Sequence, residues 1–303
     1  MPWTAYQVIL RLHAPLHVGR GRVSYLQRAR PYVTGRVLRG ALVSRVGRNN
    51  PALRSNDPRD PYRCVSKTFA QYLTFTYFYP ALEKKEEPGK WEVCFPWKCE
   101  ARFRRRFLSS YTAAALEYPQ QTAAEGLLYE TEFIAPYTLD KGDPVYLMGY
   151  IFVDEARLPC DKYDWKAAFR RLQLGGERGY GWGDVRLIDN GIQQVSGNDK
   201  LFGQICFDPN TKRPIVTLEK DQPVLAHTDA KAGALAGPVE PVVGREWRAD
   251  NEKKNKNKRI HVGQHLPFDG VRFAPGSVVS NKSDFVIGEG GYWQQQPPQE
   301  RAP

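Results

Sequence analysis

A glycine-rich segment at residues 174–184 (LGGERGYGWGD) constrains the fold of this chain more than any other stretch. Five of its residues are glycines, and Arg178, Tyr180 and Trp182 lie between them. The preceding residues 163–172 predict a short helix, and residues 185–188 alternate as a strand does. Glycine tolerates a positive φ and lets the backbone approach a ligand closely, and successive exposed amides can bind an anion. With two aromatic rings and a guanidinium beside it, such a loop suits a ligand that offers both phosphates and bases, as nucleic acid does.

Two other interpretations apply to a glycine-rich loop. In a dinucleotide-binding fold the loop follows a strand and opens a helix, whereas this one follows a predicted helix and enters a predicted strand, so we discount that function. The plainer alternative is a turn that packs Tyr180 and Trp182 into the core. The loop alone does not show whether it binds nucleic acid or is a turn whose rings pack in the core. The rest of the chain is needed to decide.

The N-terminal part contains a second glycine-punctuated loop. Residues 4–12 alternate as a strand, residues 13–22 form the loop, and residues 37–45 fit an amphipathic helix. Between positions 20 and 45 there are seven arginines and no Asp or Glu. Solvated faces usually mix charges of both signs, so this cluster predicts contact with phosphate. The arginines that we expect to make this contact are Arg20, Arg22, Arg36 and Arg39.

The composition favours a polyanionic partner. The chain has 44 Lys and Arg against 33 Asp and Glu, which gives a net charge of +11 over 303 residues. A basic surplus of this kind suggests nucleic acid or another polyanion. No apolar run approaches the roughly 18 to 20 residues of a membrane span, and the N-terminus lacks the pattern of a secretory signal. We therefore expect a cytoplasmic location and no membrane partner.

Five cysteines, at positions 64, 94, 99, 160 and 206, do not form the pattern of a disulfide framework. Cys94 and Cys99, together with Cys64 and Cys160, leave a zinc site open, although no tight Cys-x2-Cys pair is present. Buried free thiols are the favoured account. We therefore assign no metal and no cofactor to this chain.

The order of the predicted elements defines the expected fold. The strand at 4–12 and the helix at 37–45 are followed by strands at 127–136 and 145–153, and then by the helix and strand that flank the glycine-rich loop. This is the βαββαβ order of a ferredoxin-like (RRM-like) fold. We therefore expect an α+β protein in which residues 1–190 form a ferredoxin-like core with a large insertion at about 48–125. Within this insertion, residues 68–79 fit either a buried strand or a short helix.

Residues 191–293 are expected to form a β-rich C-terminal extension. A second, degenerate ferredoxin-like half is one arrangement that its predicted strands allow. Residues 237–244 are the only plausible linker. The polar run at 251–259 is expected to be a mobile loop that can lie on RNA, and residues 294–303 a disordered tail. The strands predicted in this part lie at 203–207, 214–218, 271–279 and 284–293.

Two segments together resemble the RAMP superfamily of CRISPR-associated proteins. Residues 16–42 (LHVGRGRVSYLQRARPYVTGRVLRGAL) are similar to its opening strand, loop and first helix, and residues 172–187 (LQLGGERGYGWGDVRL) are similar to its glycine-rich loop. The resemblance is closest to the type III subunit that caps the 5′ tag of the guide RNA, including the type III-D version. It covers the core and says little about residues 48–125 or the C-terminal third. The residues that match the N-terminal motif are His17, Gly19, Arg36, Gly40 and Ala41.

The resemblance implies a protein that binds RNA without cutting it, for defence against foreign nucleic acid. RAMP folds are ferredoxin-like and bind guide RNA through the glycine-rich loop and the sheet. The implied partners are the guide RNA (crRNA), backbone RAMP subunits and the large polymerase-like subunit, with target RNA contacted indirectly. The residues that we expect to bind RNA are His17, Gly19, Arg20, Arg22, Arg36, Arg39, Gly175, Gly176, Arg178, Gly179, Tyr180, Gly181 and Trp182; Gly183 also matches the loop.

Two catalytic alternatives remain open from the sequence. A metal-independent endoribonuclease that processes the guide precursor needs a general acid and base, which His13 or His17 with Tyr25 or Lys67 would supply. A backbone subunit that cleaves target RNA needs an aspartate on an exposed loop, and the basic loop has none. Aspartates at positions 57 and 60 keep this second alternative open.

Overall fold

The computed structural model of the chain describes residues 3–53, 60–118, 122–196, 199–231, 233–244 and 268–296. A central sheet has the strand order β10-β11-β1-β9-β5-β6, and β4 also pairs with β9. Every one of these pairings is antiparallel. The elements of this core are β1 (Thr4–Leu12), α1 (Gly35–Asn49), α2 (Asp60–Tyr72), β4 (Leu73–Phe75), β5 (Tyr79–Glu83), β6 (Trp91–Val93), β9 (Tyr146–Val153), α4 (Trp165–Ala168), β10 (Arg171–Gln173) and β11 (Asp184–Val195).

The topology of the central sheet is ferredoxin-like. Along the chain, β1 is followed by helices, then by β4 and β5, by β9, by α4 and by β11, which is the order βαββαβ. In space the fourth strand lies beside the first, the first beside the third, and the third beside the second. The predicted α+β class and ferredoxin-like core are therefore confirmed. β11 continues to Val195 and pairs with β1 along its length, so it runs past the expected boundary at residue 190.

The second core strand lies elsewhere than the sequence predicts. β4 and β5 occupy this position, whereas residues 127–136 belong to a separate sheet. The expected insertion at 48–125 therefore contains α2 and a strand of the core. The apolar run at 68–79 fits both structures because it contains both, the end of α2 and the whole of β4. The predicted strand at 145–153 corresponds to β9 and is confirmed.

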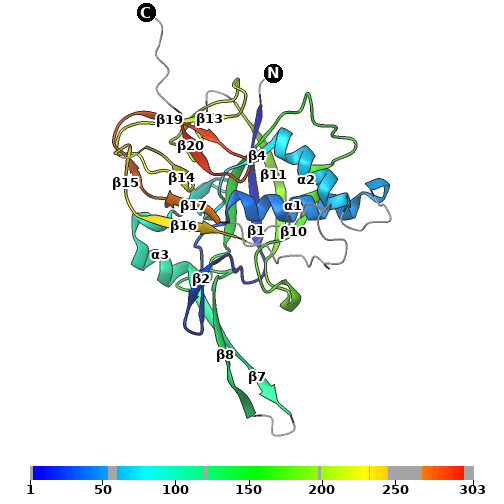
Figure 1. Ribbon diagram of the computed structural model, residues 1–303, viewed down its shortest axis with the longest axis vertical. Coiled ribbons are helices and arrows are strands. Elements are labelled where there is room, and N and C mark those ends of the chain that lie inside the picture. Colours follow the sequence, from blue (N-terminus) through cyan, green and yellow to red (C-terminus); the bar gives the residue numbers. More distant parts are fainter. Residues whose placement is uncertain are drawn as a thin grey trace, which may run out of the picture.

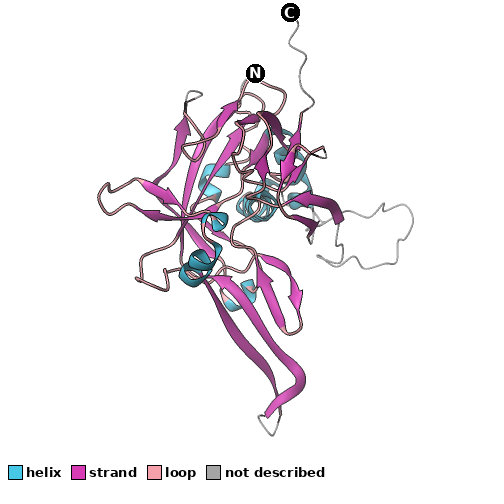
Figure 2. Cartoon of the chain, turned by 90° about the vertical axis from the view of Figure 1, so that its left-hand side faces the viewer, coloured by secondary structure: helices cyan, strands magenta, loops and turns pink. Residues whose placement is uncertain are grey.

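A four-stranded sheet with the order β2-β3-β8-β7 carries a long hairpin, which we call the arm. β7 and β8 form the arm, and they project away from the body of the molecule (Figures 1 and 2). β3 pairs with the base of β8, so the basic N-terminal loop is attached to the arm. The bounds are β2 (Gly19–Val23), β3 (Leu26–Ala29), α3 (Glu100–Phe107), β7 (Leu108–Glu117) and β8 (Thr122–Ile134).

The helix that precedes the glycine-rich loop is shorter than predicted. It spans Trp165–Ala168 only, and its N-terminus is capped by Asp164, whose Oδ1 accepts a hydrogen bond from the Ala167 amide at 2.8 Å. The end of the predicted segment 163–172 enters β10 instead, because Arg171 and Leu172 pair with β11. The glycine-rich loop therefore closes a β-hairpin.

Both faces of the central sheet are buried. On β1, the side chains of Val8 and Leu10 pack with those of α1, α2 and α4 in one apolar cluster. Ile9 points to the other face, where it packs with residues of the C-terminal part. This alternation follows from the two-residue period of a strand, and it makes the central sheet the middle layer of the protein.

The C-terminal part forms a seven-stranded sheet with the order β12-β13-β19-β20-β14-β17-β16. Among the described residues from 199 to 296 every helix or strand element is a strand, so the strand–helix alternation of a second ferredoxin-like half is not found there. The predicted linker at 237–244 is wrong, because it contains a strand of this sheet. The bounds are β12 (Cys206–Asp208), β13 (Ile215–Leu218), β14 (Thr228–Asp229), β16 (Val239–Val243), β17 (Phe268–Phe273), β19 (Ser283–Ile287) and β20 (Trp293–Gln295), with β15 (Leu235–Ala236) and β18 (Val278–Val279) forming a separate pair.

The prediction of a disordered tail from residue 294 is wrong at its start. Gln294 pairs with Val286 in β20, and the Gln296 amide donates to the Asp284 carbonyl oxygen at 2.9 Å. The rest of the predicted tail, and the polar run at 251–259, lie outside the described residues.

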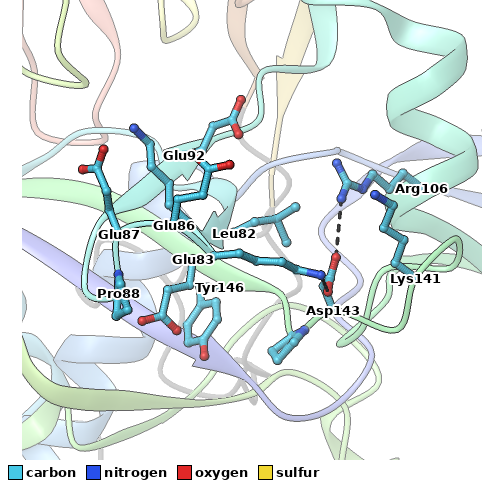
Figure 3. A pocket seen from close by; sticks show the side chains of 13 residues that line it. Leu82, Glu83, Glu86, Glu87, Pro88, Glu92, Arg106, Lys141, Asp143 and Tyr146 are labelled. Atoms are coloured by element: carbon cyan, nitrogen blue, oxygen red, sulfur yellow. Dashed lines mark ion pairs between the residues drawn. The ribbon is translucent and has the colours of Figure 1, made fainter.

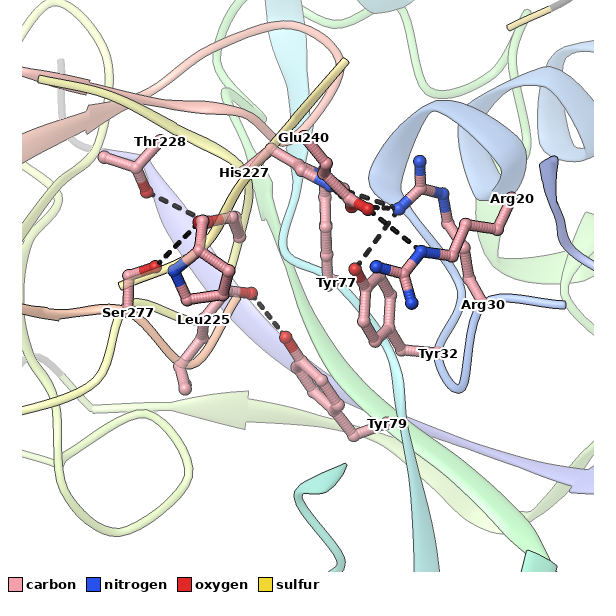
Figure 4. A network of polar contacts seen from close by, with 12 residues as sticks. Arg20, Arg30, Tyr32, Tyr77, Tyr79, Leu225, His227, Thr228, Glu240 and Ser277 are labelled. Atoms are coloured by element: carbon pink, nitrogen blue, oxygen red, sulfur yellow. Dashed lines mark hydrogen bonds and ion pairs between the residues drawn. The ribbon is translucent and has the colours of Figure 1, made fainter. Parts of the chain in front are cut away.

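A buried polar network joins the C-terminal sheet to the basic N-terminal loop (Figure 4). Glu240 in β16 accepts hydrogen bonds from Arg30 and from His227 Nε2, the latter at 2.5 Å. His227 Nδ1 lies 2.6 Å from the Tyr77 hydroxyl. Burial alone would raise the pKa of Glu240, but the hydrogen bonds from His227 and Arg30 lower it to about 2. The carboxylate therefore stays charged and links the C-terminal sheet to Arg30 and, through His227, to Tyr77 between β4 and β5.

Candidate nucleic-acid interface

The glycine-rich loop is fastened to the N-terminal loop by backbone hydrogen bonds. The Gly176 amide donates to the His17 carbonyl oxygen and the Gly183 amide to the Pro15 carbonyl oxygen, both at 2.8 Å. The two segments that carry the family resemblance are therefore in direct contact, although they are far apart in the sequence.

Two of the loop glycines are required by packing within the protein. Gly175 has φ +76°, and a Cβ there would lie 2.2 Å from the His17 carbonyl oxygen. Gly183 has φ +78°, and a Cβ there would lie 1.9 Å from the Leu174 carbonyl oxygen. Real Cβ atoms do not approach backbone oxygens this closely, so these positions need glycine whether or not RNA is bound.

Two other loop glycines face open space. A Cβ at Gly179 or Gly181 would meet no atom of the protein within 4 Å, although Gly181 has φ +82°. Gly176 is intermediate, because its Cβ would lie 3.2 Å from His17 Cδ2. A ligand that follows the loop backbone therefore has room at Gly179 and Gly181. The sequence alone did not separate these two classes of glycine.

His17 lies at the centre of this contact rather than on the surface. Its side chain is buried, and Nδ1 is 2.7 Å from the Glu132 carbonyl oxygen in β8, to which it donates. The Glu132 carboxylate in turn accepts a hydrogen bond from the Ala29 amide at 2.9 Å and pairs with Arg104. His17 therefore holds the loop, the arm and the N-terminal segment together. Gly19 opens β2 and is exposed.

The aromatic residues of the loop lie against the arm, not in the core. Trp182 meets Phe133 of β8 edge-on at 5.0 Å between ring centroids, and Tyr111 of β7 at 6.3 Å. Tyr180 is 77% exposed and lies near Tyr129 on β8, whose pKa it helps to raise. The alternative of a turn that buries both rings in the core is therefore wrong for Tyr180. We call these five residues the aromatic surface.

The predicted phosphate-binding arginines fall into two groups. Arg20 and Arg22 lie on β2, where every residue is exposed, although Arg20 also pairs with Glu240 at 3.0 Å. Arg36 and Arg39 lie on α1 and are largely buried. The structure does not bring this second pair to the glycine-rich loop.

Arg36 and Arg39 attach α1 to the C-terminal part. Arg36 pairs with Asp269 of β17 and lies 5.4 Å from the ring centroid of Tyr292. Arg39 pairs with Glu289 at 2.6 Å and donates to the Ser66 carbonyl oxygen at 2.9 Å. Their prediction as phosphate ligands rested on a local run without acidic residues. The acidic partners come from more than two hundred positions further along the chain, and a local charge count does not find them.

Four arginines line a cleft between α1 and the loop, and three of them, Arg45, Arg48 and Arg171, were not predicted as site residues. The cleft has a volume of about 250 Å³. We call it the arginine cleft, and the residues that define it are Arg45, Arg48, Arg171, Arg178, Gly181 and Asp184. Arg178 is the one predicted site residue whose side chain borders it. Two sequence features could have indicated the other arginines. Arg45 and Arg48 are three residues apart and so lie on one side of α1, and Arg171 comes shortly before the glycine-rich loop.

A larger pocket of about 700 Å³ lies between the β5–β6 hairpin and residues 141–146 (Figure 3). Glu83, Glu86 and Glu87 line it, and Lys85 and Arg106 are paired with Asp143 at 3.2 Å and 3.7 Å. The carboxylates repel phosphate, and two of the cations, Lys85 and Arg106, already have a carboxylate partner. This pocket is therefore not part of the candidate interface.

The groups proposed for RNA cleavage come from different segments: His13 and His17 follow β1, Tyr25 lies between β2 and β3, and Lys67 lies in α2. No hydrogen bond joins His13 or His17 to Tyr25 or Lys67 among the described residues. His13 is exposed, and desolvation, together with the charges of Arg186 and Arg11, lowers its pKa. Asp57 lies outside the described residues, and Asp60 begins α2.

The cysteines are free thiols at separate places. Cys64 lies 3.1 Å from the Tyr163 hydroxyl, and burial raises the pKa of the Cys94 thiol to about 11. In the residues that the structure describes, no group of three or more His, Cys, Asp and Glu side chains is arranged to hold a metal ion. Likewise, none of the described helices is long and apolar enough to cross a membrane.

No family model matches this sequence, and no curated protein matches it. Among solved structures, similar chains occur in three cryo-EM structures of Type III-B Cmr-beta: bound to cognate target RNA, in the apo state, and bound to cognate target RNA and AMPPnP. Their sequence identities are 13%, 11% and 12%, and their TM-scores are 0.38, 0.40 and 0.48. The alignments cover 60%, 63% and 90% of this chain and 96%, 97% and 85% of the respective chains. Similarity at this level assigns neither a family nor a function to this chain.

Proposed function

We propose that this chain is a non-catalytic RNA-binding subunit of a type III CRISPR effector ribonucleoprotein, in which it holds the 5′ tag of the guide RNA. The observation that carries this proposal is the direct contact between the two motifs of the RAMP resemblance. The Gly176 amide donates to His17, and Gly175 has no room for a side chain beside the same carbonyl oxygen. Motifs that resemble one family in sequence thus form one site in space.

The chemistry of this site favours RNA over a small ligand. Tyr180 and Tyr111 are 77% and 59% exposed, and exposed rings of this kind stack on bases whatever the base sequence. Arg20 and Arg22 on β2 add positive charge on the strand that is joined through β3 to the base of the arm. Single-stranded RNA is the ligand that uses aromatic rings and guanidinium groups in repeated succession.

The partners follow from the same proposal. The guide RNA is bound directly, the backbone RAMP subunits and the large polymerase-like subunit are neighbours in the complex, and target RNA is contacted indirectly. No step of this function needs a cofactor, and we assign none.

The experiment that tests the proposal is purification of the tagged protein from its host, followed by sequencing of the bound RNA. Enrichment of guide RNAs, together with the other effector subunits, is the expected result. The matched control is the Tyr111→Ala/Tyr180→Ala variant, which removes two exposed rings of the aromatic surface and should lose the RNA without losing solubility. Recovery of no RNA, or of RNA unrelated to CRISPR repeats, with the wild-type protein would refute the proposed function.

A further inference from the structure

We infer that the arginine cleft binds one phosphate group of the RNA, on the side of the glycine-rich loop that faces α1. The inference rests on the proposed function, because it names the part of the RNA that this cleft takes. Bases stack on the aromatic surface through Tyr180 and Trp182, and the cleft receives the sugar–phosphate backbone beside Arg178. The loop then lies between a base and a phosphate of the same strand.

The charge of the cleft is the first reason. Four guanidiniums line it against one carboxylate, Asp184. That carboxylate is already occupied, because Arg171 Nε donates to it at 2.7 Å and Arg186 Nη2 at 3.1 Å. Arg48 donates to the Ser44 hydroxyl at 2.9 Å, which leaves its charge uncompensated.

Arg45 and Arg178, like Arg48, have no carboxylate partner among the described residues that line the cleft. Neither forms an ion pair with a carboxylate among the residues that the structure describes. Three guanidiniums held near one another without a counter-ion repel each other, and an anion placed between them removes this repulsion. Arginine is suited to this because its planar fork donates two parallel hydrogen bonds to a phosphate.

The size and the lining of the cleft select the ligand. Its volume of about 250 Å³ is below the roughly 300–1,000 Å³ of pockets that enclose a drug-sized molecule. No aromatic side chain lines it, so it offers no surface on which a base would stack. Gly181 borders it with space for a ligand against the backbone. A phosphate fits these conditions, either as an internal phosphodiester or as the terminal phosphate of a strand.

The test compares two double variants that each remove two positive charges. Arg45→Gln/Arg48→Gln changes the cleft, and Arg102→Gln/Arg105→Gln changes two exposed arginines of α3 outside it. Binding of a repeat-derived oligoribonucleotide is measured by fluorescence anisotropy over a series of salt concentrations. The cleft variant should bind about ten- to a hundredfold more weakly, as expected for the loss of hydrogen bonds between charged groups. Its plot of log K against log salt should be shallower by about 0.7, the contribution of one phosphate on a single strand. The α3 variant should keep the wild-type slope.

The same titrations with a 5′-hydroxyl and a 5′-phosphorylated oligoribonucleotide distinguish the two sources of phosphate. An equal loss of affinity with both RNAs assigns the cleft to an internal phosphodiester, and a loss only with the phosphorylated RNA assigns it to the terminal phosphate.

Wild-type affinity and slope in the cleft variant would overturn the inference. If Tyr180→Ala weakens binding in that case, the proposed function still holds, whereas absence of RNA binding by the wild-type protein refutes the function itself. Should the double variant melt early, Arg45→Gln alone, on a half-exposed position of α1, provides the same comparison.

Discussion

Replacing Gly175 with alanine should destabilise the free protein, whereas replacing Gly179 should leave its stability unchanged. At Gly175 the backbone has φ +76°, which costs a residue with a Cβ about 1–2 kcal/mol. The new Cβ would also lie 2.2 Å from the His17 carbonyl oxygen, so this oxygen must move away from the Gly176 amide that donates to it. A weakened hydrogen bond adds about 0.5–1.5 kcal/mol. Together the two effects predict a destabilisation of about 1.5–3.5 kcal/mol.

Gly179→Ala is the matched control within the same loop. Its Cβ would meet no protein atom within 4 Å, and its φ lies outside the left-handed region. The free protein should therefore melt at the wild-type temperature. If RNA follows the loop backbone, the added methyl group occupies space that the RNA needs, and RNA affinity should fall although the stability does not.

Differential scanning calorimetry and fluorescence anisotropy on the two variants separate these effects. For domains of roughly 150–250 residues, 1 kcal/mol corresponds to about 2–4 °C of melting temperature, so Gly175→Ala should melt about 3–14 °C lower. A wild-type melting temperature for Gly175→Ala would refute the account of the contact between the loop and His17. Wild-type RNA affinity for Gly179→Ala would show that RNA does not approach this part of the loop.

Four further outcomes are expected. Tyr180→Ala should weaken RNA binding by about 1–3 kcal/mol at an unchanged melting temperature, because its ring is 77% exposed; a lower melting temperature would contradict its placement on the surface. Arg36→Ala/Arg39→Ala should lower the denaturation midpoint and leave the salt slope of RNA binding unchanged, since both side chains pair with the C-terminal part; a shallower slope would restore them as phosphate ligands. Glu240 has a pKa of about 2 in the folded protein against 4.5 for an ordinary carboxyl, so its stabilising charge is fully present above pH 4.5 and is lost as the pH falls toward 2. Glu240→Gln should therefore lower the melting temperature at pH 7 and flatten its decline over that window, and an unchanged acid profile would speak against the network. The isolated protein should leave a repeat RNA intact with or without magnesium, and single-site cleavage that His17→Ala abolishes would establish the endoribonuclease instead.

The sequence predicts the core of this fold well where local periodicity decides the structure. The alternation in β1 and the nearly continuous apolar run of β9 identify both strands, because a strand buried on both faces need not alternate. The second core strand was placed wrongly for a different reason. Residues 127–134 have the stronger strand pattern, yet they pair with β7 and β3 in the arm, and pairing partners are not encoded in the pattern of one strand.

The candidate site was predictable in its location but not in its division of roles. The glycine-rich loop and the segment at His17 were both identified, and they meet. Which glycines face protein and which face open space depends on the position of the Leu174 and His17 carbonyl oxygens, and the sequence gives no information about these positions. The short segment of glycines therefore serves two purposes that only the three-dimensional structure separates.

The sequence also does not show which arginines have a carboxylate partner in the folded protein. Seven of them lie between positions 20 and 45 without a local acidic residue, and this run suggested a continuous phosphate-binding surface. Folding divides the run, because Arg30, Arg36 and Arg39 find carboxylates in the C-terminal part. Arg45 is left next to the loop without such a partner among the described residues, and it joins Arg178 in the arginine cleft. The positive charge that is free to bind RNA thus includes Arg22 on the exposed strand β2 and the arginines of the cleft. Removing the ion pairs of Arg30, Arg36 and Arg39 should disturb the fold before it disturbs the charge of the cleft.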